Sequence, residues 1–201
     1  MGKDNTVQID EKLNFFNELL LQMVTRVEEA LLKATVAFRD HDVEMAKKVI
    51  ADDYFIDQMR EMIENDAVRL LISEAPYGHY MRHVIAGLKM VTSLERMGDH
   101  ATHLAKVAFK LGIAQDAEIV IVNKIVEMAT ADAAMFREAT VALAKTDAIA
   151  AKEIAKKDNI IDAYRKEINE LIFEANSSLK TNKNYGNELF ELFYLVKELE
   201  R

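Results

Sequence analysis

The sequence predicts an all-α protein built from two tandem repeats of an antiparallel three-helix bundle, and three observations support this. The 201 residues include six Gly, one Pro and no Trp, and Ala, Leu, Glu, Lys and Met are abundant. This composition is typical of long helices with few turns. Apolar residues recur at three- and four-residue spacing between Leu13 and Ala34. The sequence also resembles itself after a shift of 105 residues.

The first three-helix unit is expected over residues 8–111. Its helices are expected to cover about 13–39, 42–73 and 80–111. Asp42 should cap the second helix, because a short acidic side chain accepts hydrogen bonds from the free amides of a first turn. Pro76, the only proline, lies close to Gly78 and predicts the turn into the third helix.

The second unit is expected over residues 115–201, after a short polar link at 111–118. Residues 42–63 lie over residues 147–168 without a gap. Eight positions are identical in the two copies, counted in the first copy as Asp42, Ala46, Lys47, Asp53, Ile56, Asp57, Arg60 and Ile63. The same shift lays residues 94–96 over 199–201, so a duplication is indicated. Because the second copy stops at the position of Arg96, we expect it to be C-terminally incomplete.

Charge and composition exclude several classes of function. The formal charge is −8 and the basic residues are scattered, so nucleic acid is not an expected partner. The absence of Cys fits a reducing compartment and excludes thiolate chemistry. No apolar window is long enough to cross a membrane, and residues 1–10 lack the apolar core of a signal peptide. We therefore expect a cytoplasmic protein without membrane insertion.

Two pairs of acidic residues lie on the second and third expected helices. Glu95 and Asp99 fall within about 80° of the middle of the buried stripe of the third helix. Asp53 and Asp57 border the corresponding stripe of the second helix. Because the turn at Pro76 makes these helices antiparallel, and both pairs lie equally far from it, the four carboxylates are expected to converge.

Such a cluster requires neutralisation, since burial and mutual repulsion both disfavour ionised carboxylates. The candidates are Arg60 and Arg96, or a cation that prefers oxygen ligands. The second copy repeats the pattern at Asp158, Asp162 and Glu200, with Arg165 beside them. The predicted metal ligands are therefore Asp53, Asp57, Glu95, Asp99, Asp158, Asp162 and Glu200, with Arg60, Arg96 and Arg165 as neighbouring cations.

Two histidines accompany the acids on the third helix. His103 lies on the flank of the buried stripe, where it is expected either to bond to a carboxylate or to act as a further metal ligand. His100 faces away, toward another helix or the surface. Gly98, inside the same helix, suggests close approach of a neighbouring helix or a ligand.

Motifs of other chemistries are missing from the sequence. There is no P-loop, G-x-G-x-x-G, H-E-x-x-H or G-x-S-x-G motif. No Glu is followed at the third position by His, as the ferritin-like di-iron bundles require.

Residues 94–108, 52–59 and 157–164 together resemble the PhoU family of phosphate-uptake regulators. The resemblance implies tandem three-helix bundles whose E(D)-x-x-x-D pairs bind clusters of iron, zinc, manganese or magnesium ions. It also implies a cytoplasmic homodimer that restrains phosphate uptake and the phosphate-starvation response and is not an enzyme. Its partners would be the ATPase-driven ABC phosphate transporter and the associated sensor histidine kinase.

The sequence departs from the family pattern in two places. His103 stands where the family usually has Asn, and Lys106 stands where an acid often follows. Glu200 lacks the acidic partner expected four residues later, so the second metal site is expected to be weak or empty.

Two alternatives remain open at this point. The chain could be a metal-free helical scaffold or dimerisation module in which Arg60, Arg96, Arg165 and Arg201 neutralise the acids. A metal-dependent phosphohydrolase would draw only on the clustered carboxylates, with no nucleophile or phosphate-binding loop visible.

Overall fold

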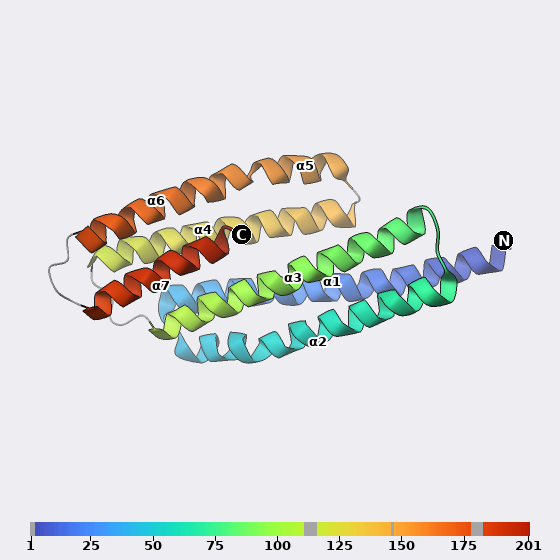
Figure 1. The fold of residues 1–201 in the computed structure, drawn as a ribbon, viewed down its shortest axis with the longest axis horizontal. Coiled ribbons are helices and arrows are strands. Elements are labelled where there is room, and N and C mark those ends of the chain that lie inside the picture. The colour runs from blue at the N-terminus through green and yellow to red at the C-terminus, as the bar shows by residue number, and fades with distance from the viewer. Residues whose placement is uncertain (1–2, 111–115, 146, 178–182) are drawn as a thin grey trace.

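The computed structural model describes residues 3–110, 116–145, 147–177 and 183–201, and all regular structure within them is helical (Figure 1). The helices are α1 (Lys3–Asp40), α2 (Val43–Glu74), α3 (His79–Lys110), α4 (Asp116–Ala144), α5 (Ala148–Lys156), α6 (Asp158–Ser177) and α7 (Lys183–Leu199). The predicted all-α fold class is therefore confirmed.

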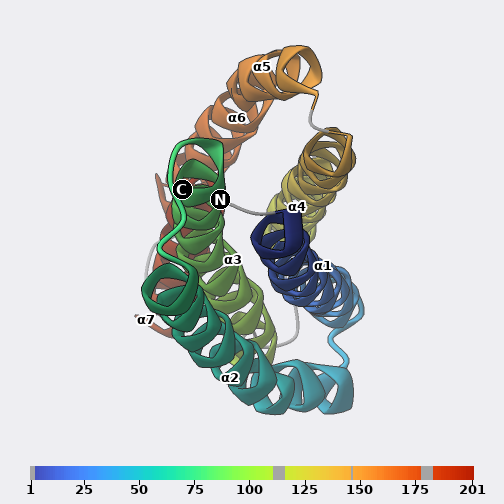
Figure 2. The same cartoon turned by 90° about the vertical axis from the view of Figure 1, so that its right-hand side faces the viewer.

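The first bundle consists of α1, α2 and α3, each packed against the other two (Figures 1 and 2). Its core includes Phe16, Met23, Val27 and Phe38, none of which is exposed to solvent. Helix α1 begins at Lys3, well before the expected start near residue 13. The early turns are largely polar, so no apolar period marks them in the sequence.

The turns of this bundle form where the sequence predicts them. The Asp42 carboxylate accepts a hydrogen bond of 3.0 Å from the Met45 amide and caps α2. Helix α2 ends at Glu74, its C-cap residue Ala75 has a left-handed φ of 40°, and Pro76 follows directly. Gly78 has a φ of 64°, which Gly adopts without strain. Of the expected link at 111–118, residues 111–115 lie outside the described residues.

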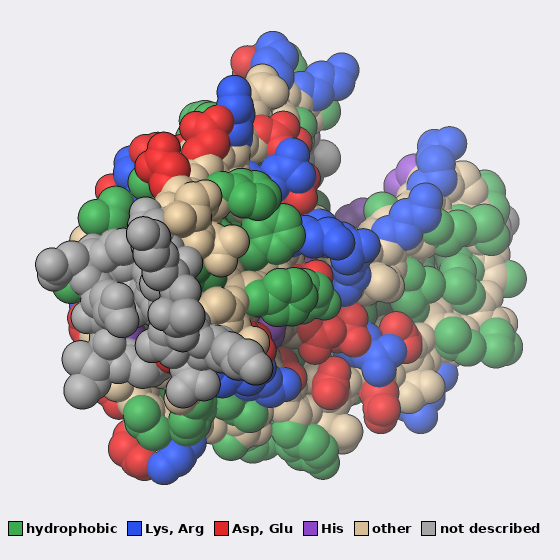
Figure 3. All heavy atoms as spheres, turned by 60° about the vertical axis from the view of Figure 1, so that its left-hand side comes forward, with side chains coloured by type: hydrophobic (Ala, Val, Ile, Leu, Met, Phe, Trp, Pro, Cys, Tyr) green, Lys and Arg blue, Asp and Glu red, His purple; other side chains and the backbone are tan. Residues whose placement is uncertain are grey.

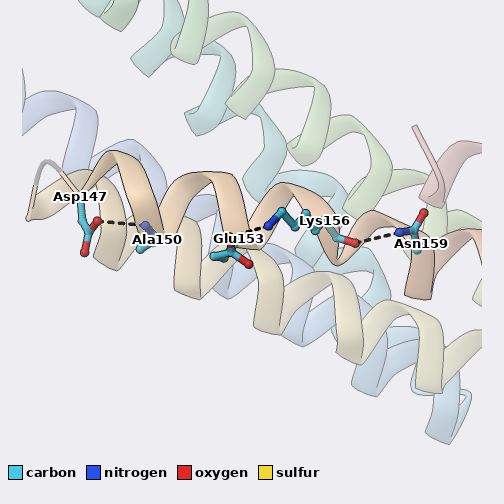
Figure 4. A network of polar contacts seen from close by, with 5 residues as sticks. All are labelled: Asp147, Ala150, Glu153, Lys156 and Asn159. Carbon is cyan, nitrogen blue, oxygen red and sulfur yellow. Dashed lines mark hydrogen bonds and ion pairs between the residues drawn. The ribbon is translucent and has the colours of Figure 1, made fainter.

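The alignment of residues 147–168 with 42–63 implies one continuous middle helix in the second bundle. In the structure this segment is instead divided into α5 and α6 at Lys157. The Asp147 carboxylate caps α5 by accepting from the amides of Ile149 and Ala150. At the division, the side-chain amide of Asn159 donates to the Lys156 carbonyl (Figure 4). Lys157 forms an ion pair with Glu138 of α4. The Asn159 contact competes with the backbone ladder, because it occupies a carbonyl oxygen that a continuous helix would use.

The 105-residue shift also relates the cores of the two bundles. It pairs buried residues Phe16 with Ile121, Met23 with Met128, Ile56 with Ile161, Ile63 with Ile168, Val84 with Leu189, and Val91 with Val196. Helix α1 packs beside α4, and α3 beside α7 (Figure 2). Within the described residues, no helix has the length and apolarity needed to span a membrane.

Candidate metal site between the second and third helices

Gly98 allows α3 to lie close against α2. A Cβ atom at this position would lie 3.0 Å from Cδ1 of Ile56 and 3.5 Å from Oδ1 of Asp53. Such contacts leave little room for any side chain larger than hydrogen. The close approach suggested by the sequence is therefore present, and it holds the acidic residues of the two helices against one another.

The four carboxylates of the first repeat act on one another electrostatically. Burial raises the pKa of Asp53, and the charges of Asp99 and Asp57 raise it further, while a hydrogen bond from the Thr102 hydroxyl lowers it. Burial likewise raises the pKa of Glu95, and the charges of Asp99, Asp57 and Asp53 add to this effect. Asp53 and Glu95 thus feel the charges of the other acidic residues of this seam, whereas Asp57 and Asp99 are themselves exposed.

Cationic side chains offset this charge only in part. The Nε atom of Arg60 lies 3.8 Å from Oε1 of Glu95, which is too long for a hydrogen bond, and its Nη1 atom lies 3.7 Å from Glu64. The same Nε atom is buried without a hydrogen-bond partner in the described structure. Lys106 lowers the pKa of Asp53, but its charge ranks below the other influences. Arg96 is exposed and lines a cavity on the other side of α3.

The acids of the second repeat are arranged differently. Arg165 lies between Asp162 and Glu200, with N–O distances of 3.5 Å to each carboxylate. Asp158 instead lies near Asp132 of α4, whose pKa it raises. Asp132, Asp158 and Glu200 line one cavity of about 380 Å³. This acidic set is therefore divided between an arginine and a further carboxyl group.

Asp132 was not among the residues singled out from the sequence. Its Oδ2 atom is buried and has no hydrogen-bond partner in the described structure. Burial raises the pKa of Asp132 to about 7, and the charge of Asp158 contributes to the shift. The repeat shift lays Asp132 over Val27, a fully buried position of the first bundle. This correspondence is the signal that could have revealed it.

His100 and His103 of α3 face α7. The His103 ring packs edge-on against Tyr194, with 5.3 Å between ring centroids, and burial lowers its pKa. The carboxylates that act on His103 are Glu198 and Glu191 of α7. Nδ1 of His100 lies 3.5 Å from Glu198, which confirms its expected contact with another helix. Both rings therefore contribute to the seam between the repeats, and ligation by His103 stays a prediction.

The carboxylate groups of the first repeat are chemically suited to bind a hard cation. Carboxylate oxygens are the ligands that magnesium, calcium and manganese prefer. The pKa values of Asp53 and Glu95 are raised first by burial and then by the charges of neighbouring acids, and for Glu95 the charge of Arg60 only partly opposes this. In the described part of the chain, the side chains as they stand bring no three acidic or imidazole groups around a single point. Side-chain rotation would therefore have to accompany metal binding.

Comparison with known proteins agrees with this architecture. The PhoU domain model matches residues 20–108 and 125–201. The chain is 30% identical to the phosphate-specific transport system accessory protein PhoU homolog of Clostridium acetobutylicum, covering 90% of this chain and 81% of that protein. It is 31% identical to the homolog of the same name from Streptococcus pneumoniae, covering 96% and 88%.

Two solved structures have the same fold. The crystal structure of PhoU from Pseudomonas aeruginosa matches with a TM-score of 0.86 and 26% identity, covering 95% of this chain and 90% of that one. The phosphate transport system regulatory protein PhoU from Streptococcus pneumoniae matches with a TM-score of 0.80 and 26% identity, covering 96% and 91%. By sequence and by structure, the chain belongs to the PhoU family.

Proposed function

We propose that this protein is an accessory regulator of phosphate transport whose α2–α3 seam binds metal ions. Its family membership and the names of its relatives as phosphate-specific transport system accessory proteins support the regulatory role. The observation that carries the metal-binding part is that Asp53 and Glu95 are repelled by the acids beside them, while Arg60 lies 3.8 Å from Glu95 and its Nε atom has no hydrogen-bond partner in the described structure.

Asp53 and Asp57 of α2 would hold the ion together with Glu95 and Asp99 of α3. A bound divalent or trivalent cation supplies the positive charge that this acidic seam lacks. The side chains of the chain itself fix where that charge sits, because Gly98 holds the two backbones close together. Binding would thus stiffen the seam and reduce the negative potential of this face. Asp158, Asp162 and Glu200 form the weaker second set.

The chain would act as an adaptor on the ABC phosphate transporter, through its ATPase, and on the associated sensor histidine kinase. In this role it would restrain phosphate uptake and would perform no catalysis of its own. The homodimer implied by the family resemblance stays a prediction, which light scattering of the purified protein would test.

The metal-binding part is tested by the double variant Asp57→Asn, Asp99→Asn. We expect calorimetric titration with Mn²⁺ to show binding by the unaltered chain and loss of it in this variant. The matched control is Glu11→Gln, Asp66→Asn, because these acids also come from two helices and line one small cavity beside Arg69. Equal and negligible binding by all three proteins would contradict metal binding.

The regulatory part is tested in cells that lack the gene. We expect deletion to raise phosphate uptake and starvation-reporter output, and the unaltered gene to restore both. The double variant Asp57→Asn, Asp99→Asn should restore them only partly if metal is needed for regulation. Unchanged uptake and reporter output after deletion would contradict the regulatory role, whatever the metal titration shows.

A metal-free helical scaffold is the second candidate, and the placement of Arg165 between Asp162 and Glu200 favours it. Arg60→Gln separates the two readings. If arginine neutralises the acids, the variant loses stability and gains no metal affinity. If a cation does so, the variant binds Mn²⁺ at least as tightly as the unaltered chain, because a competing positive charge has been removed.

A further inference from the structure

Two cationic side chains act on the acidic seam of the first repeat, one toward each end. Arg60 lies beside Glu95, whereas the charge of Lys106 acts on Asp53. Lys106 follows Glu95 by about three turns of α3, so the two cations are well separated along the seam. Figure 3 shows acidic side chains gathered below the hollowed part of one face, with lysine and arginine side chains beside them.

The carboxylate of Asp53 lies against α3 one turn ahead of Lys106. A Cβ atom on Gly98 would lie 3.5 Å from Oδ1 of Asp53, and the hydroxyl of Thr102 donates a hydrogen bond to this carboxylate. Thr102 is 5% exposed, so its hydroxyl lies inside the contact between the helices. Gly98, Thr102 and Lys106 follow at intervals of four residues and therefore share one side of α3. Because helical side chains lean toward the N-terminus, that of Lys106 leans back toward Asp53.

Lys106 is available as a counter-ion for Asp53. Its side chain is exposed and forms no ion pair with the carboxylates of the described residues. Its charge lowers the pKa of Asp53, in support of this role. Lys110, one turn further along α3, is instead held by Glu191 of α7, with 2.8 Å between Nζ and Oε1.

The charges of the seam leave a deficit that one divalent ion would fill. The four carboxylates of the proposed metal site carry four negative charges when ionised, and Arg60 and Lys106 supply two positive ones. Two negative charges are left, which one divalent cation balances. Asp57 and Asp99 are exposed and form no ion pair within the described part of the chain. The uncompensated charge therefore lies between the two cations.

We propose that Lys106 is a tethered counter-ion of Asp53 that limits this seam to a single divalent ion. The ammonium group stands in for a second cation at the Asp53 end of the seam. A further ion would meet a seam whose negative charge is already balanced, and Lys106 would repel it. This inference rests on the metal-binding part of the function proposed above, and it specifies the charge and the number of ions that the site takes.

The test is a calorimetric titration of the full chain with Mn²⁺, for the unaltered protein and for Lys106→Met. Ions at the seam are counted as the difference from Asp57→Asn, Asp99→Asn, so that ions held by the second repeat do not contribute. We expect one ion at the seam of the unaltered chain. Lys106→Met removes the charge of an exposed side chain and should bind Mn²⁺ about threefold to tenfold more tightly. That gain should shrink at high ionic strength, because the charge of an exposed lysine is screened.

A charge reversal and a matched control complete the test. Lys106→Glu turns the counter-ion into a further carboxylate and should let the seam take a second Mn²⁺, seen as exchange-coupled manganese in the electron paramagnetic resonance spectrum. Lys110→Met removes the same charge from the same helix, at a side chain that pairs with Glu191. This control should leave both the affinity and the number of ions unchanged.

The results separate this inference from the proposed function. Equal affinity of Lys106→Met and the unaltered chain, or two ions at the seam of the unaltered chain, would overturn the counter-ion role and leave metal binding standing. So would a single ion in Lys106→Glu, or an equal gain in Lys110→Met, which would assign the effect to the overall charge of the chain. Absence of Mn²⁺ from the seam in all of these proteins would remove the proposed metal site and this inference with it.

Discussion

The two repeats share one helical plan but complete it differently. In the first, α2 is continuous and α3 runs to Lys110 along both of its neighbours. In the second, the middle helix is divided at Lys157 into α5 and α6. The comparison shows that a duplicated pattern of core residues fixes the helix register in both bundles, although only the first keeps its middle helix continuous.

The acidic residues of the two repeats also differ in their electrostatic surroundings. Asp53, Asp57, Glu95 and Asp99 act on one another in the first repeat. Their counterparts in the second repeat are drawn apart, toward Arg165 on one side and toward Asp132 on the other. Identical motif residues therefore give unequal sites, because their surroundings differ.

The largest effect is expected from placing the half-buried acid of the second repeat, Asp132, at its equivalent position in the core of the first. Val27→Asp places a carboxyl group at a position with no solvent exposure. We expect a loss of about 4 kcal/mol or more in the free energy of unfolding, since the new group has no partner. Urea denaturation followed by circular dichroism measures it. A loss below about 1 kcal/mol would show that the first bundle is no more tightly closed than the second.

The reverse change, Asp132→Val, should stabilise the protein. The pKa of Asp132 is raised to about 7, so its proton favours the folded state, and this stability is present at low pH and lost between about pH 4 and pH 7. We expect the variant to gain about 2 to 4 kcal/mol at pH 8. The difference between variant and unaltered chain should shrink as the pH falls toward 4. A difference that does not change with pH would contradict a buried, neutral Asp132.

The next effect on stability is expected when Gly87 and Phe16 of the first repeat are replaced by the side chains found at the equivalent positions of the second. A Cβ atom on Gly87 would lie 2.5 Å from Cε1 of Phe16, and the equivalent residues of the second repeat are Leu192 and Ile121. Gly87→Leu alone should cost about 3 kcal/mol through overpacking. Combining it with Phe16→Ile should recover at least half of that loss. Additive losses in this double-mutant cycle would mean that the two positions are not packed as equivalents.

The smallest effects concern the two helix caps. Asp42→Ala and Asp147→Ala should each cost about 1 kcal/mol of local helix stability. Asp42 caps the 32-residue α2, so its loss should lower global stability. Asp147 caps the 9-residue α5, so its loss should mainly speed amide hydrogen exchange within that helix. If the amide hydrogens of α5 exchange equally fast in Asp147→Ala and in the unaltered chain, α5 does not open independently of the rest of the second bundle.

The sequence predicted the features that depend on local chemistry and on periodicity. The Asp42 cap, the turn at Pro76 and the all-helical repeat all follow from short patterns, and the structure has each of them. Helical geometry and an equal distance to one turn predicted that the acids on α2 and α3 influence one another, and the pKa shifts of Asp53 and Glu95 agree, while their convergence on one ion stays a prediction. These features need no knowledge of distant contacts.

Tertiary contacts account for what the sequence did not show. At the division, Lys157 pairs with Glu138 of α4, a contact between two helices that spacing along the sequence does not reveal. The burial of Asp132 follows only when α4 is placed in its bundle, although the repeat shift to Val27 hinted at it. Arg165 was predicted as a neighbour of the acids, but its position between Asp162 and Glu200 could not be derived from spacing alone.

The most direct test of the metal-binding account is a crystal grown with Mn²⁺, with anomalous diffraction recorded at the manganese edge. We expect a peak between α2 and α3, within coordination distance of Asp53, Asp57, Glu95 or Asp99, and a weaker one or none at Asp158 and Glu200. Carboxylates of the first repeat paired with Arg60, and no anomalous peak beside them, would contradict the account.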